Sequence, residues 1–267
     1  MHDLYGVQKP STLGRVASRE SVATAAPAGR RRPGPRRALT EEDILDAALA
    51  LLDEGGPHAA SIRGIAARVG VAPNAVYTYF PDKAAVVRAL VERLLGQVDH
   101  DVFADRSRPW RERVEALALD LRAHLSAHPG AVGMMIGGPM AGPHALALNE
   151  HLLDVLADAG LERTEAARAS YLLIVHVFGS IALEVADVHQ AGPLPPESER
   201  VAARKAAFSA TPVDHFPRSA AAGDTMAGYI STEQYLWGLH RILDGITARA
   251  APAVARSRGP STPGGPG

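Results

Sequence analysis

The 267-residue sequence contains no cysteine. This absence excludes disulfide bonds, thiolate nucleophiles and cysteine-based zinc sites. Long apolar runs are also lacking, because the longest apolar stretch, around residues 171–177, falls far short of the ~20 residues that a membrane helix needs. The N-terminal residues show no apolar segment followed by a small-residue cleavage site. We therefore expect a cytoplasmic protein with no membrane partner.

The sequence also has almost no overall charge, because its net charge is −1. Residues 1–37, however, hold eight basic and two acidic side chains, a net of +6, which leaves −7 on the remaining 230 residues. A basic segment attached to an acidic body favours contact with a polyanion, although a solubilising tail has the same composition. Residues 1–37 lack apolar periodicity and residues 250–267 are rich in Pro, Gly and Ser, so we predict that both segments are disordered.

The rest of the sequence predicts an all-α fold. Apolar residues recur at helical spacing almost everywhere, and no alternating pattern is long enough to indicate a sheet. The helix expected over 164–188 is apolar on most faces, so we predict that it is buried on all sides. Prolines and glycines punctuate residues 192–224, where we expect no regular helix. The predicted helices cover residues 40–54, 61–69, 73–79, 85–98, 110–127, 145–159, 164–188 and 232–248.

The most informative spacing lies in residues 61–79. A helix from Ser61, a three-residue turn that begins with Gly70, and a short helix from Pro73 predict a helix-turn-helix, whose second helix can lie in a DNA major groove. In that helix we expect Val76 and Phe80 to point inward. Asn side chains can pair with adenine, and hydroxyl groups suit phosphate oxygens. The residues expected to be exposed are Asn74, Ala75, Thr78 and Tyr79.

The stretch from Gly70 to Lys83 strongly resembles the signature of TetR-type repressors, and the resemblance covers roughly residues 38–98. It implies that Tyr77, Tyr79 and Lys83 contact phosphates, that Ser61, Ile62 and Arg63 begin the supporting helix at the DNA, and that Pro73, Asn74, Ala75 and Thr78 face the bases. A core role for Tyr77, and solvated charges for Lys83 and Arg63, are the alternatives. With two arginines of the basic segment included, the expected DNA contacts are Arg36, Arg37, Thr40, Ser61, Ile62, Arg63, Ala72, Pro73, Asn74, Ala75, Tyr77, Thr78, Tyr79 and Lys83.

The charge of this region argues against tight DNA binding by the helices alone. Residues 38–98 carry five basic and eight acidic residues, a net of −3, and adding the five arginines of residues 30–37 brings the net to +2. Non-specific affinity for DNA comes chiefly from phosphate neutralisation. We therefore expect the basic arm to assist the domain, as minor-groove arms do in homeodomains.

A weaker resemblance, to the C-terminal domain of tetracycline repressors, continues through Trp110, the bend at 128–131, the break at 159–161 and the segment 208–216. It implies a homodimer formed through a four-helix bundle, to which helices 164–188 and 232–248 contribute, and a pocket for a small-molecule effector. Apolar residues of the second helix would line the interface, although both faces can instead pack within one chain. These interface residues are Tyr235, Leu236, Leu239 and Ile242.

The effector expected from this resemblance is not tetracycline. Met134 stands where tetracycline repressors have their magnesium-binding histidine, and Ala116 and Asp120 fall near the positions of the Asn and Phe drug contacts. Methionines form deformable apolar walls, which indicates a more apolar effector, although ordinary core filling explains them too. The expected ligand-binding residues are Asp99, Leu117, Met134, Met135, Met140, Leu152 and His176.

Catalytic and metal chemistry find little support in the sequence. Eleven histidines are present, but no HExxH motif accompanies them, so we expect no metal and no cofactor. The sequence also lacks a nucleophile–base pair and a glycine-rich phosphate loop. We predict four parts: a basic arm (1–37), a DNA-binding domain (38–98), a ligand-binding and dimerisation domain (99–249) and a tail (250–267). The predicted function is a homodimeric repressor released from a palindromic operator by a small molecule; the alternatives are a DNA-binding regulator without such a ligand and a helical enzyme.

Overall fold

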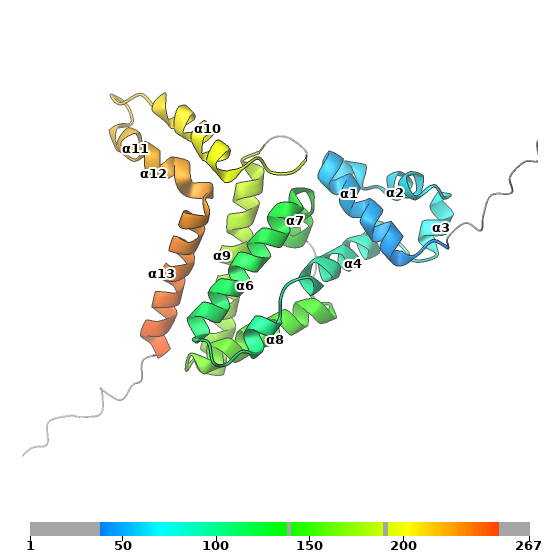
Figure 1. Cartoon of the computed structure of the whole chain (residues 1–267), viewed down its shortest axis with the longest axis horizontal. Coiled ribbons are helices and arrows are strands. Elements are labelled where there is room, and N and C mark those ends of the chain that lie inside the picture. The colour runs from blue at the N-terminus through cyan, green and yellow to red at the C-terminus, as the bar shows by residue number, and fades with distance from the viewer. Residues whose placement is uncertain (1–37, 138–139, 189–191, 251–267) are drawn as a thin grey trace, which may run out of the picture. The chain divides into compact units, whose positions relative to one another are not determined.

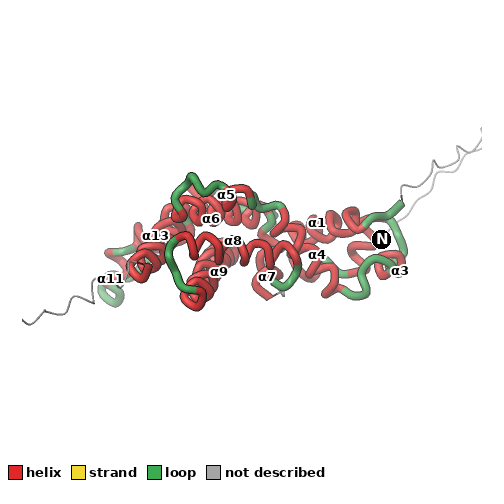
Figure 2. Tube along the Cα trace, turned by 90° about the horizontal axis from the view of Figure 1, so that it is seen from below, coloured by secondary structure: helices red, strands yellow, loops and turns green. Residues whose placement is uncertain are grey.

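The computed structural model describes residues 38–137, 140–188 and 192–250, and its regular elements within these ranges are all helical (Figures 1 and 2). The all-α prediction is therefore confirmed. The predicted basic arm and tail lie outside the described residues. The elements are α1 (Glu41–Ala59), α2 (Ile62–Val69), α3 (Pro73–Tyr77), α4 (Lys83–Gly96), α5 (Asp101–Ala104), α6 (Trp110–Ala127), α7 (Pro129–Gly137), α8 (Pro143–Asp158), α9 (Arg163–Ala186), α10 (Glu197–Ser209), α11 (Pro217–Ala221), α12 (Gly223–Ala227), the 3-10 turn η1 (Gly228–Ile230) and α13 (Thr232–Ala250).

Short local signals set the ends of the first helices. Thr40 and Asp43 form a capping box at the start of α1, in which the Asp43 amide donates to Thr40 Oγ1 at 3.1 Å and the Thr40 amide donates to Asp43 Oδ2 at 2.9 Å. Ser61 caps α2 in the same way, by accepting from the Gly64 amide at 3.0 Å. Gly70 ends α2 at φ 73°, a conformation that only glycine adopts without strain. The turn between α2 and α3 is therefore encoded locally.

The four N-terminal helices enclose one part of the core. Ile44 of α1, Ile65 of α2, Val76 of α3 and Leu90 of α4 are almost completely buried, and Phe80 closes the cluster. The prediction that Val76 and Phe80 point inward is therefore correct. Helix α3 packs against α2 on this inner side, which leaves its opposite side in solvent.

The remaining core lies where α9 packs against α6, α7, α8 and α13. Leucines from α6, α8 and α9 and Phe178 of α9 are buried there, together with Tyr235 and Leu239 of α13. Two of the four α13 residues expected at a dimer interface thus pack within the chain, in agreement with the alternative, while Leu236 and Ile242 are half-buried.

The junction between these two groups of helices is a close contact of α1 with α7. The backbone at Gly130 approaches α1 so closely that a side-chain carbon there would overlap the Leu52 carbonyl. Beside it, His128 Nδ1 lies 2.8 Å from Asp53 Oδ2. Glycine at position 130 is therefore required by the approach of the two backbones.

Several expectations about the helices are wrong. Helix α7 begins at Pro129, which was expected only to stop the preceding helix, because proline suits the first turn of a new helix. Residues 192–224 contain α10, α11 and the start of α12, since their prolines stand between helices or at the first position of one. The fourth helix begins at Lys83 after its cap Asp82, two residues earlier than predicted. Helix α5, only four residues long, was not predicted at all.

Helix α9 is not buried on all sides as predicted. Tyr171 is 70% exposed and Leu183 is 73% exposed, and Leu172 and Val175 are each about half exposed. By length and hydropathy alone, α9 is long and apolar enough to cross a membrane. The short apolar stretch at residues 171–177 had not indicated this. Its inner face nevertheless packs against four other helices, so the exposed apolar stripe is what requires an explanation.

Candidate nucleic-acid interface and ligand cavities

The outer side of α3 presents a small polar and aromatic surface. Pro73, Asn74 and Thr78 are exposed, and the Tyr77 side chain is 50% exposed. Ala75 is half-buried. Tyr77 is therefore a surface aromatic rather than a core residue. The α2–α3 unit thus presents side chains that can contact base edges and phosphates on one side.

Tyr79 and Lys83 are tied to the protein's own backbone. The Tyr79 hydroxyl donates to the Leu39 carbonyl, and the half-buried ring packs against the core. Tyr79 is therefore less exposed than expected, because its phenol links α3 to the residue before the α1 cap. Lys83 Nζ donates to the Pro57 carbonyl at 2.9 Å. An ammonium has three protons, so this bond holds Lys83 in place and leaves two for another acceptor.

The remaining predicted DNA contacts vary in exposure. Arg63, Ala72 and Thr40 are exposed, and Thr40 is occupied by its capping box. Ser61 and Ile62 are half-buried, because Ser61 caps α2 and Ile62 packs against the core. Arg36 and Arg37 lie outside the described residues.

Two of the five cations in residues 38–98 are neutralised within the domain. Arg68 makes a paired contact with Glu54, and Arg93 contacts Asp46. The hydrogen bond from Arg68 holds the pKa of Glu54 below its usual value. Within the part of the chain that the structure describes, Arg63, Lys83 and Arg88 have no carboxylate partner, so they remain available to phosphates.

The predicted ligand-binding residues do not converge on one site. Leu117 and Leu152 line a small apolar cavity of about 20 Å³. Met135 is buried, and Met134 and Met140 are half-buried against the core, but none of the three reaches that cavity. Asp99 is exposed, and its amide donates to Asp120 Oδ2 at 2.8 Å. The other cavity walls are Val114, Ala118, Leu121, Leu148, Leu173, Ile174, Val177 and Phe178.

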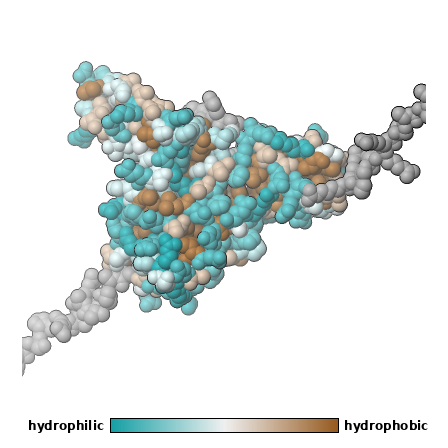
Figure 3. Space-filling model, in the orientation of Figure 1, coloured by the Kyte–Doolittle hydropathy of each residue, from teal (hydrophilic) through white to brown (hydrophobic). Residues whose placement is uncertain are grey.

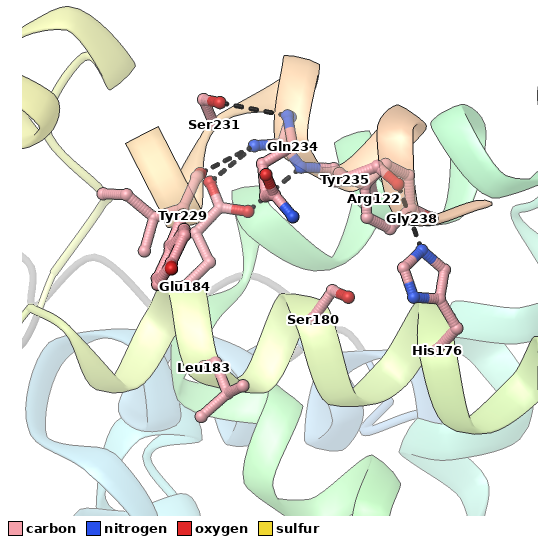
Figure 4. Close-up of a pocket in the computed structure, with 11 residues that line it drawn as sticks. Arg122, His176, Ser180, Leu183, Glu184, Tyr229, Ser231, Gln234, Tyr235 and Gly238 are labelled. Carbon is pink, nitrogen blue, oxygen red and sulfur yellow. Dashed lines mark hydrogen bonds and ion pairs between the residues drawn. The ribbon is translucent and has the colours of Figure 1, made fainter. Parts of the chain in front are cut away.

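His176 belongs to a different, open cleft of about 370 Å³ between α9, α13 and η1 (Figure 4). Its Nε2 lies 3.1 Å from the Tyr235 carbonyl, and its ring stacks on the Tyr235 ring. Ser180 and Gln234 add polar groups, and Leu183 forms part of the outer edge. The cleft opens beside the exposed stripe of α9.

The base of this cleft is an ion-pair network that the sequence analysis missed. Arg122 of α6 donates from Nε and Nη2 to the two carboxylate oxygens of Glu184, both at 3.0 Å. Arg200 of α10 also donates to Glu184, at 2.7 Å, and all three side chains are largely buried. A glutamate that follows the apolar middle of α9 was the available signal, since a buried carboxylate needs cationic partners.

Glu197 and Thr232 extend the network to the start of α13. Thr232 donates to Glu197 Oε2 from its amide at 3.0 Å and from its hydroxyl at 2.7 Å. Burial acts to raise the pKa of Glu197, but these bonds and the one from Arg122 outweigh it and hold the pKa below its usual value. Tyr235 lies alongside, and burial raises the pKa of its phenol, which donates to the Ala118 carbonyl at 2.7 Å. The network thus joins α6, α9, α10 and α13.

The exposed apolar stripe of α9 continues onto α13. It consists of Tyr171, Leu172, Val175 and Leu183 on α9 and Trp237, 58% exposed, on α13; we call it the α9–α13 face. Gly179 and Gly245 have open space where a side chain would stand. Apolar residues also reach the surface at Val213 and Phe216, between α10 and α11. Figure 3 shows brown, apolar surface at the tip where Figure 1 places α10 and α11.

The histidines do not assemble into a metal site among the described residues, where no group of three or more potential ligands occurs. His124 pairs with Asp120 at 3.2 Å, within one turn of α6. His151 stacks on Phe103 and lies near His100. These histidines have structural partners.

Two protein-family models match the sequence. Residues 44–90 match the model described as bacterial regulatory proteins, tetR family, and residues 104–250 match the tetracyclin repressor-like C-terminal domain. Among curated proteins, an HTH-type transcriptional regulator of Saccharopolyspora erythraea is 32% identical over 200 residues, which cover 74% of this chain and 83% of the relative. The HTH-type transcriptional repressor DrrR1 of Streptomyces coeruleorubidus is 26% identical over 244 residues, which cover 87% and 86% of the two chains.

Solved structures have the same fold. A possible TetR family transcriptional regulator from Streptomyces coelicolor matches with a TM-score of 0.69 and 28% identity, over 79% of this chain and 100% of that chain. ActR from Streptomyces coelicolor, in complex with (S)-DNPA, matches with a TM-score of 0.67 and 20% identity, over 80% and 100%.

Proposed function

Because the chain belongs to the TetR family of transcriptional regulators, we propose that it is a homodimeric repressor that leaves a palindromic operator when a small molecule binds. The observation that carries this proposal is the α2–α3 unit, which presents Asn74, Tyr77 and Thr78 on one exposed surface. Asn74 lies at the N-terminal end of α3, where it can reach base edges. The hydroxyl groups of Tyr77 and Thr78, together with Lys83, can reach phosphates. We extend the proposal to the four-part organisation inferred from the sequence and to a cytoplasmic location.

A second copy of the chain best explains the α9–α13 face. The face combines large apolar side chains with glycines that leave room for a close approach of helices. The large apolar side chains of the face resemble the core of an obligate interface, and the charged Arg168 and Arg241 lie beside them. A two-fold axis through this face would relate the two α3 helices and so require an operator of two inverted half-sites. A bilayer is a poorer partner, since α9 also carries the ion-paired Glu184.

The effector is best accommodated by the apolar cavity between α6, α8 and α9. All its walls are apolar, and the side chains that would chelate a drug-bound magnesium are absent, because Met134 replaces the histidine. The effector is therefore an apolar molecule other than tetracycline. With about 20 Å³ of free space, the cavity must widen before such a molecule enters, so binding is coupled to helix movement. ActR, which has the same fold, was solved in complex with (S)-DNPA, so this fold is compatible with a bound ligand.

The small size of the cavity also favours a second candidate, a family member that binds DNA without a small-molecule ligand. Selection of bound sequences from random DNA identifies the operator, and a mobility shift with that operator then serves as the assay. Release by a compound from a panel of apolar metabolites supports the ligand-released repressor. Failure to bind any selected DNA contradicts the regulator itself.

Asn74→Ala is expected to relax the preference for one base pair in each half-site, because it removes a side chain that can pair with adenine. The loss of discrimination should be ~1–3 kcal/mol at that position. Lys83→Ala is the matched comparison: it should weaken binding to all sequences equally and lower the salt slope by about one unit. Binding titrations against single-base operator variants measure both. An Asn74→Ala protein with unchanged affinity and preference would mean that another surface reads the bases.

Deleting residues 1–37 is expected to reduce DNA affinity and its salt dependence. The remaining domain carries a net of −3 over residues 38–98, and each phosphate that the arm no longer neutralises lowers the salt slope by about 0.9. Several arginines acting together should therefore reduce the slope by several units, while the dimer stays intact. If plots of log affinity against log salt concentration coincide for the full and truncated proteins, the arm makes no contribution to DNA binding.

A further inference from the structure

Helix α8 lacks a cap from its own neighbouring residues. Its N-cap position is Gly142, which has no side chain, and its first turn contains no acidic residue. The cap comes instead from Glu92 near the end of α4, whose carboxylate accepts from the amides of His144 at 2.7 Å and Ala145 at 3.4 Å. An anion at a helix N-terminus is stabilised by the unpaired amides and by the helix dipole. Glu92 therefore links α4 to α8 through the backbone of α8.

Two glycines allow this contact. A side-chain carbon at Gly142 would overlap the Glu92 carboxylate, and one at Gly96 of α4 would lie 3.0 Å from the His144 ring. The absence of these side chains lets Glu92 reach the α8 amides while the His144 ring packs against α4. The two helices are thus fixed to each other at two points, one polar and one steric.

Each helix leads from this contact to one of the proposed functional regions. Helix α4 begins with Lys83, and its Leu90 is buried in the same cluster as Val76 of α3. Helix α8 supplies Leu148 and Leu152 to the apolar cavity. The contact of Glu92 with α8 therefore lies between the cavity wall and the helices that carry the α3 surface.

We propose that Glu92 is a positioning residue that couples the apolar cavity to the DNA-reading helices. This inference rests on the proposed function and concerns its regulation. The cavity is too small for a drug-sized molecule, so a ligand must displace a wall, and α8 is a wall whose first turn is bonded to α4. When α8 moves, the carboxylate carries α4 and the attached α1–α3 with it. Without Glu92, only side-chain packing, including that of His144 against Gly96, holds α8 to α4, and their movements are less tightly coupled.

The test separates coupling from simple capping by using two variants. Glu92→Ala removes the link and the cap together. In Glu92→Ala/Gly142→Ser the freed space admits a serine at position 142, whose φ of −82° and ψ of 172° suit an N-cap. This double variant restores a local cap to α8 but leaves it unconnected to α4.

The measurement is an electron–electron distance within one chain. Because the sequence has no cysteine, spin labels attach only to cysteines introduced at the exposed positions Ala67 of α2 and Ala157 of α8. Dilution with unlabelled full-length protein confines the signal to pairs within a chain. Thermal unfolding of the same samples reports the stability of each variant.

We expect a narrow distance distribution when Glu92 is present and a distribution at least about twofold broader in both variants. Glu92→Ala should lower the melting temperature, and the added Gly142→Ser should recover most of that loss. Equal widths in all three proteins would overturn the proposal. A narrow distribution in the double variant would also overturn it, because Glu92 would then act only as a cap. The measurement requires neither operator nor effector, so its failure leaves the proposed repressor function to be tested by the mobility shift.

Discussion

Leu172→Arg is expected to convert the dimer into a monomer of about 28 kDa at low micromolar concentration. Leu172 lies in the middle of the α9–α13 face and is 49% exposed in the single chain. A two-fold interface would bury both copies of the new guanidinium without a carboxylate, and an unpaired buried charge costs several kcal/mol. Sedimentation velocity or light scattering reads the result directly.

Loss of the dimer should also abolish tight operator binding. The two DNA-reading surfaces of one dimer bind two half-sites together, which raises the affinity for the operator through effective concentration. A monomer loses this gain in affinity, about 100-fold or more. The control is Leu146→Arg, because Leu146 is a 54% exposed leucine on α8 outside this face. Leu146→Arg should remain dimeric and bind the operator normally. Dimeric Leu172→Arg with unchanged affinity would place the interface elsewhere.

Features encoded by neighbouring residues were predictable from the sequence. Thr40, Ser61 and Gly70 each act within four residues of themselves, through a cap or a left-handed turn. The helix-turn-helix and the outward positions of Asn74 and Thr78 followed from these signals together with the inward spacing of Val76 and Phe80. Apolar spacing also placed α6 and α13 to within two residues.

Features that depend on distant partners were not predictable. The Tyr79 hydroxyl is drawn inward by the Leu39 carbonyl, forty residues away in sequence. Prolines that begin α7, α8 and α11 look like helix breakers until the preceding chain is seen to turn. The scattered ligand residues show the same limit, because a position such as Met134 was assigned by resemblance, and only packing decides which side chains reach a cavity.

The ion-pair network is the clearest case, because Glu184 meets Arg122 and Arg200 from sequence separations of 62 and 16. An apolar pattern assigns α9 to the core but does not reveal which cations neutralise its one buried carboxylate. The structure identifies the two cations as Arg122 and Arg200, and α6, α9, α10 and α13 meet at these ion pairs. Its energetic importance can be measured directly.

Glu184→Ala is expected to lower the free energy of unfolding by about 3–5 kcal/mol, because it leaves the buried guanidinium of Arg200 without a carboxylate and leaves that of Arg122 with Glu197 alone. Urea denaturation followed by circular dichroism measures the loss. Asp224→Ala is the matched control: it breaks an exposed 3.1 Å pair with Lys205 and should cost no more than about 1 kcal/mol.

A second variant distinguishes charge from packing. Replacing Glu184 by Leu together with Arg122 and Arg200 by Met removes all three charges while keeping their volume, and such replacements are often neutral or stabilising. This triple variant should therefore recover most of the stability that Glu184→Ala loses. If Glu184→Ala instead unfolds at the same urea concentration as the unmodified protein, the two arginines must find other partners, and the junction of α6, α9, α10 and α13 does not depend on this carboxylate.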